Sequence, residues 1–316
     1  MVFSRIHAVS SYLPERSITN KDLEKTLDTS DEWILKRTGI SSRHILADDE
    51  SSLSMSVSAC QSLITTNQLD PRSISSVIVA TSTPHTMMPS VACQLCNHFD
   101  ISNAFAMDIN AACSGFLYAL EIAHSRLQSS QEESILVVGV DSMSRIIDWK
   151  DRQTAILFGD GAGCVLLKPS KSRGIFAINC KSEACGADYL QVTGNPYGQI
   201  PCHLSMQGKE DFRYAVERLS SSSKNLLTQH KIDISSIDWV VPHQANIRIL
   251  QQVAKKISIA PEKLITTVNT HANTSAASIP LALHVAVTDG RIQSGDRLLL
   301  QAFGAGFTWG SAICDF

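Results

Sequence analysis

The same order of elements occurs twice along the chain, although the two copies share little identity. Each copy predicts a strand, a stretch of small and polar residues, a helix and a second strand. In the first copy these segments are Ser76–Ala80, Met107–Gly115, Gly115–Leu127 and Ser134–Gly139. In the second copy they are Trp239–Val241, Val268–Ala276, Ile279–Val287 and Arg297–Gln301. Strands that alternate with helices are typical of an α/β fold, and a duplicated fold is expected to bring its two strand-to-helix junctions face to face.

A polar stretch with Pro and Gly, Lys168–Gly174, lies near the middle of the chain and predicts the boundary between the copies. We therefore divide the chain into an N-terminal half, residues 1–168, and a C-terminal half, residues 169–316. The total of 316 residues suits two domains of usual size or one large duplicated domain.

The composition excludes several classes of protein. A net charge of −3 argues against a nucleic-acid partner, because binding to phosphates needs a basic surface. The chain has no long apolar run, and the segment up to Tyr12 is unlike a signal peptide, so we expect a cytoplasmic protein without membrane contact. Its nine cysteines are expected to be thiols. Cys93 and Cys96 have no further ligands at metal spacing, so we interpret them as helix packing and expect no metal.

Three residues at predicted strand-to-helix junctions carry chemistry. Cys113 lies among small residues at the start of a helix, where the helix dipole is expected to lower the pKa of a thiol. His243 follows a strand, and Asn273 lies at the junction of the second copy that corresponds to that of Cys113. Taken singly, the cysteine can be inert packing and the other two can be helix caps. Together, a thiol and two hydrogen-bond donors suit acyl transfer through a thioester intermediate.

Six ordered motifs, which span nearly the whole chain, resemble the β-ketoacyl-acyl carrier protein synthase III family of thiolase-like condensing enzymes. They are Thr29–Ile34 with Arg37–Ile40, Asp108–Phe116, Phe158–Gly163, Pro242–Asn246, Asn273–Ser278 and Phe303–Gly310. The resemblance implies a thiolase-like fold of five layers, α-β-α-β-α, in a homodimer. It also implies an enzyme that has no cofactor, with a coenzyme A thioester as a substrate.

The resemblance implies an acyltransferase that initiates type II fatty-acid synthesis. Its reaction is a decarboxylative Claisen condensation of a short acyl-CoA, expected to be acetyl-CoA, with malonyl-acyl carrier protein. A ping-pong mechanism through acyl-Cys gives 3-ketoacyl-acyl carrier protein, CO2 and CoA. The alternative is a related condensing enzyme that uses another primer or makes a secondary metabolite.

Other classes of protein fit the sequence less well. A papain-like protease would carry an early catalytic Cys next to Trp and secretory disulfides. A degradative thiolase would carry a second catalytic cysteine near its C-terminus, where the chain offers only Cys314. A non-catalytic acyl-binding protein stays open, but it does not need Cys, His and Asn together.

The catalytic roles follow from the resemblance. Cys113 is expected to accept the acyl group, and His243 and Asn273 are expected to donate hydrogen bonds to the malonyl thioester carbonyl. The backbone N–H groups of Cys113 and Ala305 are expected to form the oxyanion site of the first half-reaction. The family commonly has Gly where this chain has Ala272 and Ala305, and we expect the Cβ of Ala305 to restrict its turn.

The binding of coenzyme A is expected to involve a short helix. Thr29 and Glu32 predict a capping box at its start, Gly39 predicts its end, and Trp33 and Arg37 share one of its faces. The resemblance implies that Trp33 and Arg152 hold the adenine and that Arg37 meets the phosphates, although Trp33 can also be core filler. The other expected contacts to the substrate are Thr29, Lys209, Phe212, Ala245 and Asn246.

Two further surfaces are expected. Met88 and Phe303 are expected to line the acyl pocket, with Met88 where relatives project an aromatic side chain into the neighbouring subunit. Arg248, Lys255 and Lys256 share one face of the helix after His243. Such a face is usually only solvated, but in this family it suits the acidic acyl carrier protein.

Overall fold

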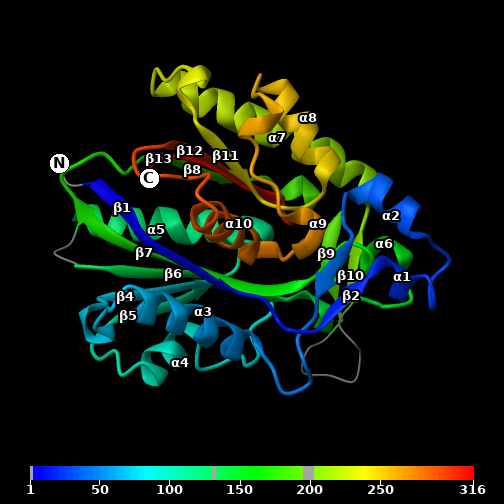
Figure 1. Ribbon diagram of the computed structural model, residues 1–316, viewed down its shortest axis with the longest axis horizontal. Coiled ribbons are helices and arrows are strands. Elements are labelled where there is room, and N and C mark those ends of the chain that lie inside the picture. The colour runs from blue at the N-terminus through cyan, green and yellow to red at the C-terminus, as the bar shows by residue number, and fades with distance from the viewer. Residues whose placement is uncertain (1–2, 130–132, 195–202) are drawn as a thin grey trace.

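The computed structural model describes residues 3–129, 133–194 and 203–316 (Figure 1). The N-terminal half contains β1 (Phe3–Tyr12), β2 (Ser17–Thr19), α1 (Asn20–Leu23), α2 (Asp31–Thr38), β3 (Ser42–His44), α3 (Ser52–Thr66), β4 (Ser76–Ala80), α4 (Val91–His98), β5 (Phe105–Ile109), α5 (Gly115–Ser129), β6 (Ile135–Ser142), α6 (Arg152–Ala155) and β7 (Asp160–Ser170). The C-terminal half contains β8 (Ile175–Ser182), β9 (Leu190–Thr193), β10 (His203–Met206), α7 (Gly208–Gln229), β11 (Trp239–Pro242), α8 (Ile247–Lys256), α9 (Val268–His271), α10 (Ser278–Thr288), β12 (Arg297–Gly304) and β13 (Thr308–Asp315).

The main sheet repeats one topology. Its order is β11-β12-β13-β8-β1-β7-β6-β4-β5, and the copies meet edge to edge at the single pair Ser4–Ile175. In the first copy β5, β4 and β6 are parallel, and β6, β7 and β1 follow antiparallel. In the second copy β11 and β12 are parallel, and β13 and β8 follow antiparallel. A bridge from Val240 to Leu264 takes the place that β5 has in the first copy. The predicted duplication is therefore confirmed.

Helices and sheets alternate in five layers (Figure 1). The strands of the first copy and those of the second copy form two layers, which we call the first and the second sheet. Helices α3 and α4 cover the outer face of the first sheet, and α7 and α8 cover the outer face of the second. Between the sheets lie α5 and α10, which pack against strands of both halves. Strand β4 is buried along its whole length, as expected of a parallel strand with helices on both faces. Each buried Val or Ile side chain contributes about 1.5–3 kcal/mol.

The segment between β7, which ends at Ser170, and β8, which begins at Ile175, is the region to compare with the predicted boundary. The predicted boundary after residue 168 falls inside β7, whose pairing with β1 continues to Ser170. We therefore propose that the two halves divide within 171–174, which belongs to the polar stretch identified in the sequence.

The two strand-to-helix junctions have the same local geometry. Asn110 Oδ1 accepts a hydrogen bond from the N–H of Ala112 at 3.1 Å, and Asn273 Oδ1 accepts one from Ser275 at 2.9 Å. Ala112 and Ser275 both have positive φ, 48° and 50°. Asn273 thus corresponds to Asn110, three residues before Cys113, so the junctions match but the two catalytic candidates do not occupy equivalent positions.

Three further features of the described part of the chain concern membrane-spanning helices, metal-ligating groups and disulfides. Within the three described ranges, no helix combines the length and apolar character needed to cross a bilayer, and no group of three or more metal-ligating side chains occurs. Eight cysteines lie in these ranges, and all eight are free; Cys202 lies outside them.

Candidate active site

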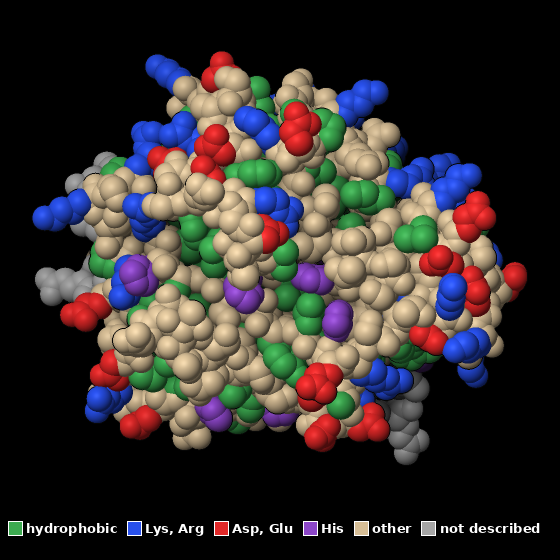
Figure 2. All heavy atoms as spheres, in the orientation of Figure 1, with side chains coloured by type: hydrophobic (Ala, Val, Ile, Leu, Met, Phe, Trp, Pro, Cys, Tyr) green, Lys and Arg blue, Asp and Glu red, His purple; other side chains and the backbone are tan. Residues whose placement is uncertain are grey.

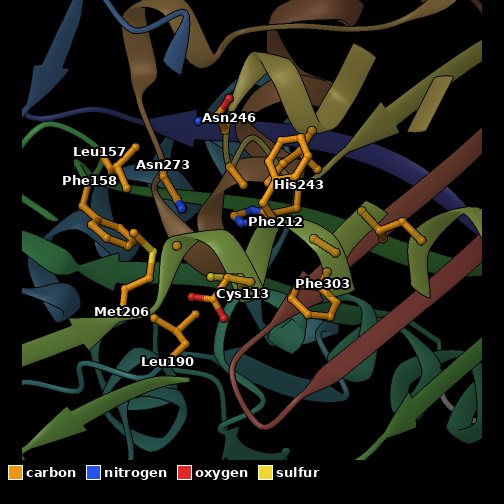
Figure 3. Close-up of a pocket in the computed structure, with 16 residues that line it drawn as sticks. Cys113, Leu157, Phe158, Leu190, Met206, Phe212, His243, Asn246, Asn273 and Phe303 are labelled. Atoms are coloured by element: carbon orange, nitrogen blue, oxygen red, sulfur yellow. The ribbon is translucent and has the colours of Figure 1, made fainter. Parts of the chain in front are cut away.

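A pocket between the two halves collects the three candidate catalytic residues (Figure 3). It encloses about 740 Å³ when the open space at its mouth is included. We call it the Cys113 pocket. Its lining residues are Cys113, Leu157, Phe158, Leu190, Met206, Gly208, Asp211, Phe212, Ala215, Leu219, His243, Ala245, Asn246, Ile249, Asn273 and Phe303.

Cys113 belongs to the 3-10 turn Ala112–Ser114 before α5, and the hairpin β12–β13 of the other half holds this turn. A Cβ on Gly304 would lie 2.7 Å from the backbone nitrogen of Cys113, so only glycine allows β12 to end so close. Ser114 Oγ donates to the Thr308 carbonyl at 3.0 Å, and Thr308 Oγ1 donates to the Ala111 carbonyl at 2.9 Å. The nucleophile candidate is therefore fixed by contacts between the two halves.

The thiol of Cys113 is protonated at neutral pH. Burial is the main cause that raises its pKa to about 12; a hydrogen bond with Ser275 opposes the shift, and the nearby carboxylates of Asp141 and Asp211 add to it. The expectation of a lowered pKa at a helix start is wrong for this state, because desolvation of a buried thiolate is the larger effect. The thiol must therefore lose its proton in the course of the reaction.

His243 is buried and neutral. Burial lowers its pKa to about 4, so it carries no positive charge at pH 7. Its Nδ1 lies 2.6 Å from Ser278 Oγ, and this hydroxyl also accepts a hydrogen bond from the N–H of Gln244 at 3.3 Å. Ser278 lies in a motif noted in the sequence, but nothing in the pattern indicated that it contacts His243.

Asn273 is held on both sides by backbone hydrogen bonds. Its N–H donates to the Leu157 carbonyl at 2.9 Å, and its own carbonyl accepts from Gly159 at 3.1 Å. Because Oδ1 accepts from Ser275, the amide nitrogen is the part of the side chain left for a ligand. Figure 3 shows this nitrogen turned toward the pocket.

Two buried carboxylates near Cys113 were missed by the sequence analysis. Asp141 accepts hydrogen bonds from Ser82 N–H at 2.7 Å, Thr83 Oγ1 at 2.9 Å and Ala276 N–H at 3.1 Å, so it joins the end of β4 to the turn before α10. Asp211, in the first turn of α7, lines the Cys113 pocket. Neither lies in a pattern that distinguishes it from a surface carboxylate.

The predicted adenine-binding residues lie together. The guanidinium carbons of Arg37 and Arg152 lie 5.1 Å and 4.9 Å from the centre of the Trp33 ring, so an aromatic plane and two cations form one surface. Helix α2 ends at Gly39, which has φ 78°, as predicted. The predicted capping box is wrong. Ser30 caps the helix by accepting from Trp33 N–H, and Thr29 Oγ1 is buried without a hydrogen-bond partner in the described part of the chain.

The other predicted binding residues divide into pocket and surface groups. Phe212, Ala245 and Asn246 line the Cys113 pocket, whereas Lys209 is exposed at the start of α7. Arg248, Lys255 and Lys256 are exposed on α8. Figure 2 shows Lys and Arg side chains around the outline of this face, including the side that carries α2 and α8.

The two alanines that replace glycine behave differently from the expectation. Ala305 does not have a positive φ; the residue of that turn with a positive φ is Gly306, at 132°, and glycine adopts this conformation without a steric penalty. Ala272 is buried with φ 59°, a conformation that a Cβ disfavours. The backbone strain therefore lies beside Asn273, not at the predicted oxyanion turn.

The two predicted acyl-pocket residues lie in different environments. Phe303 lies at the end of β12 and lines the Cys113 pocket with Cys113. Met88 is 80% exposed and does not line this pocket within its own chain.

Comparisons with known proteins agree on one family. The model described as "3-Oxoacyl-[acyl-carrier-protein (ACP)] synthase III" matches residues 107–184, and the corresponding C-terminal model matches residues 227–316. The β-ketoacyl-[acyl-carrier-protein] synthase III of Paramagnetospirillum magneticum is 44% identical to this chain and 99% of each chain is covered. The enzyme of the same name from Aliivibrio fischeri is also 44% identical, with 100% of both chains covered.

Solved structures give the same result. The crystal structure of 3-oxoacyl-[acyl-carrier-protein] synthase III from Aquifex aeolicus has a TM-score of 0.93 and 38% identity, and covers 99% of this chain and 100% of that chain. The priming β-ketosynthase of a polyketide biosynthetic pathway has a TM-score of 0.94 and 32% identity, and covers 99% of this chain and 96% of that chain.

Proposed function

The chain belongs to the 3-oxoacyl-[acyl-carrier-protein] synthase III family, an enzyme family of fatty-acid synthesis, and on this premise we propose that it condenses acetyl-CoA with malonyl-acyl carrier protein. The reaction proceeds in two half-reactions on Cys113. The observation that carries the proposal is that Cys113, His243 and Asn273, from three separate elements, line one pocket. The sequence-based expectation of a catalytic triad rests on the same residues.

In the first half-reaction Cys113 takes the acyl group. Its sulfur attacks the thioester carbonyl of acetyl-CoA, and the C–S bond to CoA breaks. The thiol proton leaves with CoA as its thiol, so no net charge remains in the buried pocket. The backbone N–H groups of Cys113 and Ala305 are proposed to stabilise the tetrahedral oxyanion, and the close contact of Gly304 with Cys113 supports their proximity.

In the second half-reaction malonyl-acyl carrier protein loses CO2. The electron pair of the broken C–C bond forms an enolate, whose carbon attacks the acyl-Cys113 carbonyl and releases the thiol after proton uptake. His243 and Asn273 stabilise the enolate oxygen as neutral donors. The hydrogen bonding supports this role: if the Ser278 hydroxyl donates to Nδ1 of His243, Nε2 carries the ring proton, and Asn273 keeps its N–H2 group free.

The two carriers are proposed to dock at neighbouring surfaces. Trp33, Arg37 and Arg152 would hold the nucleotide of coenzyme A, with Thr29, Lys209, Phe212, Ala245 and Asn246 along its path to Cys113. The exposed cations Arg248, Lys255 and Lys256 would attract the acidic acyl carrier protein.

The product assay tests this function. Purified enzyme with acetyl-CoA and malonyl-acyl carrier protein is expected to form acetoacetyl-acyl carrier protein, CoA and CO2 in equal amounts. Product formation from a longer or branched acyl-CoA, with none from acetyl-CoA, would favour a condensing enzyme that uses another primer. Such an enzyme is represented among the structural matches by the polyketide priming synthase.

We also propose a homodimer. Strand β5 forms an edge of the main sheet, and its residues are only partly buried. Met87 and Met88, which precede α4 in the sequence, are strongly exposed. An exposed strand edge and apolar side chains favour pairing with a second copy. Sedimentation equilibrium at micromolar concentration is expected to give twice the chain mass, and a monomer would contradict the proposal.

Replacing Met88 with Phe should lower kcat/KM for butyryl-CoA more than for acetyl-CoA. In the proposed dimer Met88 reaches the acyl channel of the partner, and its unbranched side chain folds aside where a ring does not. Each buried methylene of a longer primer contributes about 0.8 kcal/mol if there is room. Steady-state kinetics with both primers measure the difference. Equal effects on the two, or no effect, would show that Met88 does not line the channel.

A further inference from the structure

Most polar side-chain atoms of the Cys113 pocket are already engaged within the protein. Asn246 Oδ1 accepts from Arg248 N–H at 2.9 Å, and its amide nitrogen donates to the Arg37 carbonyl at 3.1 Å. Asn273 Oδ1 is likewise used by Ser275. The Nδ1 of His243 is bonded to Ser278. The rest of the lining is apolar apart from Cys113, Gly208 and Asp211.

Asp211 is the exception in this pocket. The residue is 8% exposed, and neither carboxyl oxygen has a hydrogen-bond partner in the described part of the chain. A buried carboxyl group without partners is unfavourable, and burial together with Glu210 raises the pKa of Asp211 to about 7. The charge of Asp211 also raises the pKa of Cys113, so the carboxyl group lies within electrostatic reach of the thiol.

The substrates bring a donor that needs such an acceptor. This step rests on the proposed function, in which acetyl-CoA and malonyl-acyl carrier protein present their thioesters on the same type of arm. The first amide of that arm is two carbons from the thioester sulfur. When the sulfur reaches Cys113, this amide enters an apolar pocket, where an unpaired N–H group is costly.

We propose that Asp211 is a specificity-determining residue that accepts a hydrogen bond from the amide N–H nearest the thioester. This hydrogen bond gives the carboxyl group a donor and the amide N–H an acceptor, and it places the thioester at Cys113. The enzyme therefore selects thioesters that carry an amide at this distance from sulfur. Among the described lining residues, Asp211 is the side chain with acceptor oxygens to spare.

A pair of small thioesters isolates this hydrogen bond. S-acetyl-N-acetylcysteamine carries the amide, and 2-acetoxyethyl thioacetate has an ester oxygen in place of the N–H with almost the same shape. The measurement is the second-order rate constant for acetylation of Cys113 by each probe, from mass spectrometry of quenched samples. The ratio of the two rate constants cancels any general effect of a substitution on thiol reactivity.

The wild-type enzyme is expected to prefer the amide probe on the order of tenfold or more. In Asp211→Leu the ratio should fall to about one, whereas Asp211→Asn, which keeps an acceptor oxygen, should retain a preference for the amide. Glu210→Gln removes the adjacent carboxylate outside the pocket and should leave the ratio at the wild-type value. A wild-type ratio in Asp211→Leu would overturn the proposal.

The design separates failure of this inference from failure of the proposed function. If the wild-type enzyme acquires no acetyl group on Cys113 from acetyl-CoA or either probe, the proposed function fails. If it is acetylated and the amide-to-ester ratio does not depend on residue 211, only the role of Asp211 fails. Asp211→Ala repeats the test without added volume if the leucine variant does not fold, and acetylation of Cys113 by the ester probe shows that a variant keeps a folded site, whatever its absolute rate.

Discussion

Replacing Cys113 with serine should abolish acyl transfer from acyl-CoA, a loss on the order of 10³-fold or more. The pocket buries this position and brings two carboxylates near it, so an alkoxide forms there even less readily than a thiolate. Decarboxylation of malonyl-acyl carrier protein should remain measurable, because His243 and Asn273 are unchanged. The measurements are enzyme-bound acetyl group after mixing with labelled acetyl-CoA, and release of CO2 from the malonyl substrate.

The control for this variant is a measurement of its thermal stability. The serine side chain fits the space of the thiol, so the thermal unfolding midpoint should stay near that of the wild-type enzyme. Condensation of acetyl-CoA with malonyl-acyl carrier protein at a near wild-type rate in Cys113→Ser would show that the nucleophile lies elsewhere.

Replacing Asn273 or His243 with alanine should slow condensation by about 10²-fold or more, the scale for loss of one preorganised donor to an oxyanion. Cys113 should still be acetylated, because these donors serve the second half-reaction. The measurement is the burst of enzyme-bound acetyl group beside the steady-state rate of condensation. An absent burst in Asn273→Ala would place this residue in the first half-reaction.

Asn273→Asp is the matched variant, because Asn273 has two roles in the structure. Its Oδ1 accepts from Ser275 N–H and so holds the turn before α10, while its N–H2 group makes no hydrogen bond to the described residues and is proposed to bind the substrate. Aspartate keeps the acceptor and removes the donor. Condensation should therefore be lost in Asn273→Asp as in Asn273→Ala, and a wild-type rate in the aspartate variant would show that Asn273 acts only by holding the turn.

The fold and the meeting of the three candidate catalytic residues in one pocket are the parts that the sequence could predict. The repeated order of elements predicts the duplicated sheet, because buried β-branched runs such as β4 and amphipathic helices such as α8 have clear patterns. Cys113, His243 and Asn273 each follow a strand or open a helix, so the topology brings them together. Such patterns show where elements begin and end along the chain, and this is enough to predict which residues lie at the strand-to-helix junctions.

The remaining features depend on three-dimensional context that the sequence pattern does not contain. Thr29 and Ser30 are adjacent and both able to cap α2, and only the backbone conformation makes Ser30 the cap. The pKa of Cys113 follows from burial by residues distant in sequence, not from its place at a helix start. The positive φ at Ala272, and not at Ala305, likewise depends on the path of the chain.

Asp211 shows the same limit within the site. Its neighbours Lys209 and Phe212 were predicted as substrate contacts, but a charged residue in the first turn of a helix is usually on the surface. Only the packing of α7 against the pocket turns its carboxyl group inward among apolar side chains.

The central claim is that Cys113 carries the acyl group between two half-reactions. The most direct test is mass spectrometry of the purified enzyme after mixing with acetyl-CoA, followed by addition of malonyl-acyl carrier protein. We expect one acetyl group per chain, located on the peptide that contains Cys113, and its disappearance as acetoacetyl-acyl carrier protein forms. An enzyme that makes acetoacetyl-acyl carrier protein without acetylation of Cys113, or an acetyl group on Cys113 that malonyl-acyl carrier protein does not remove, would contradict this claim.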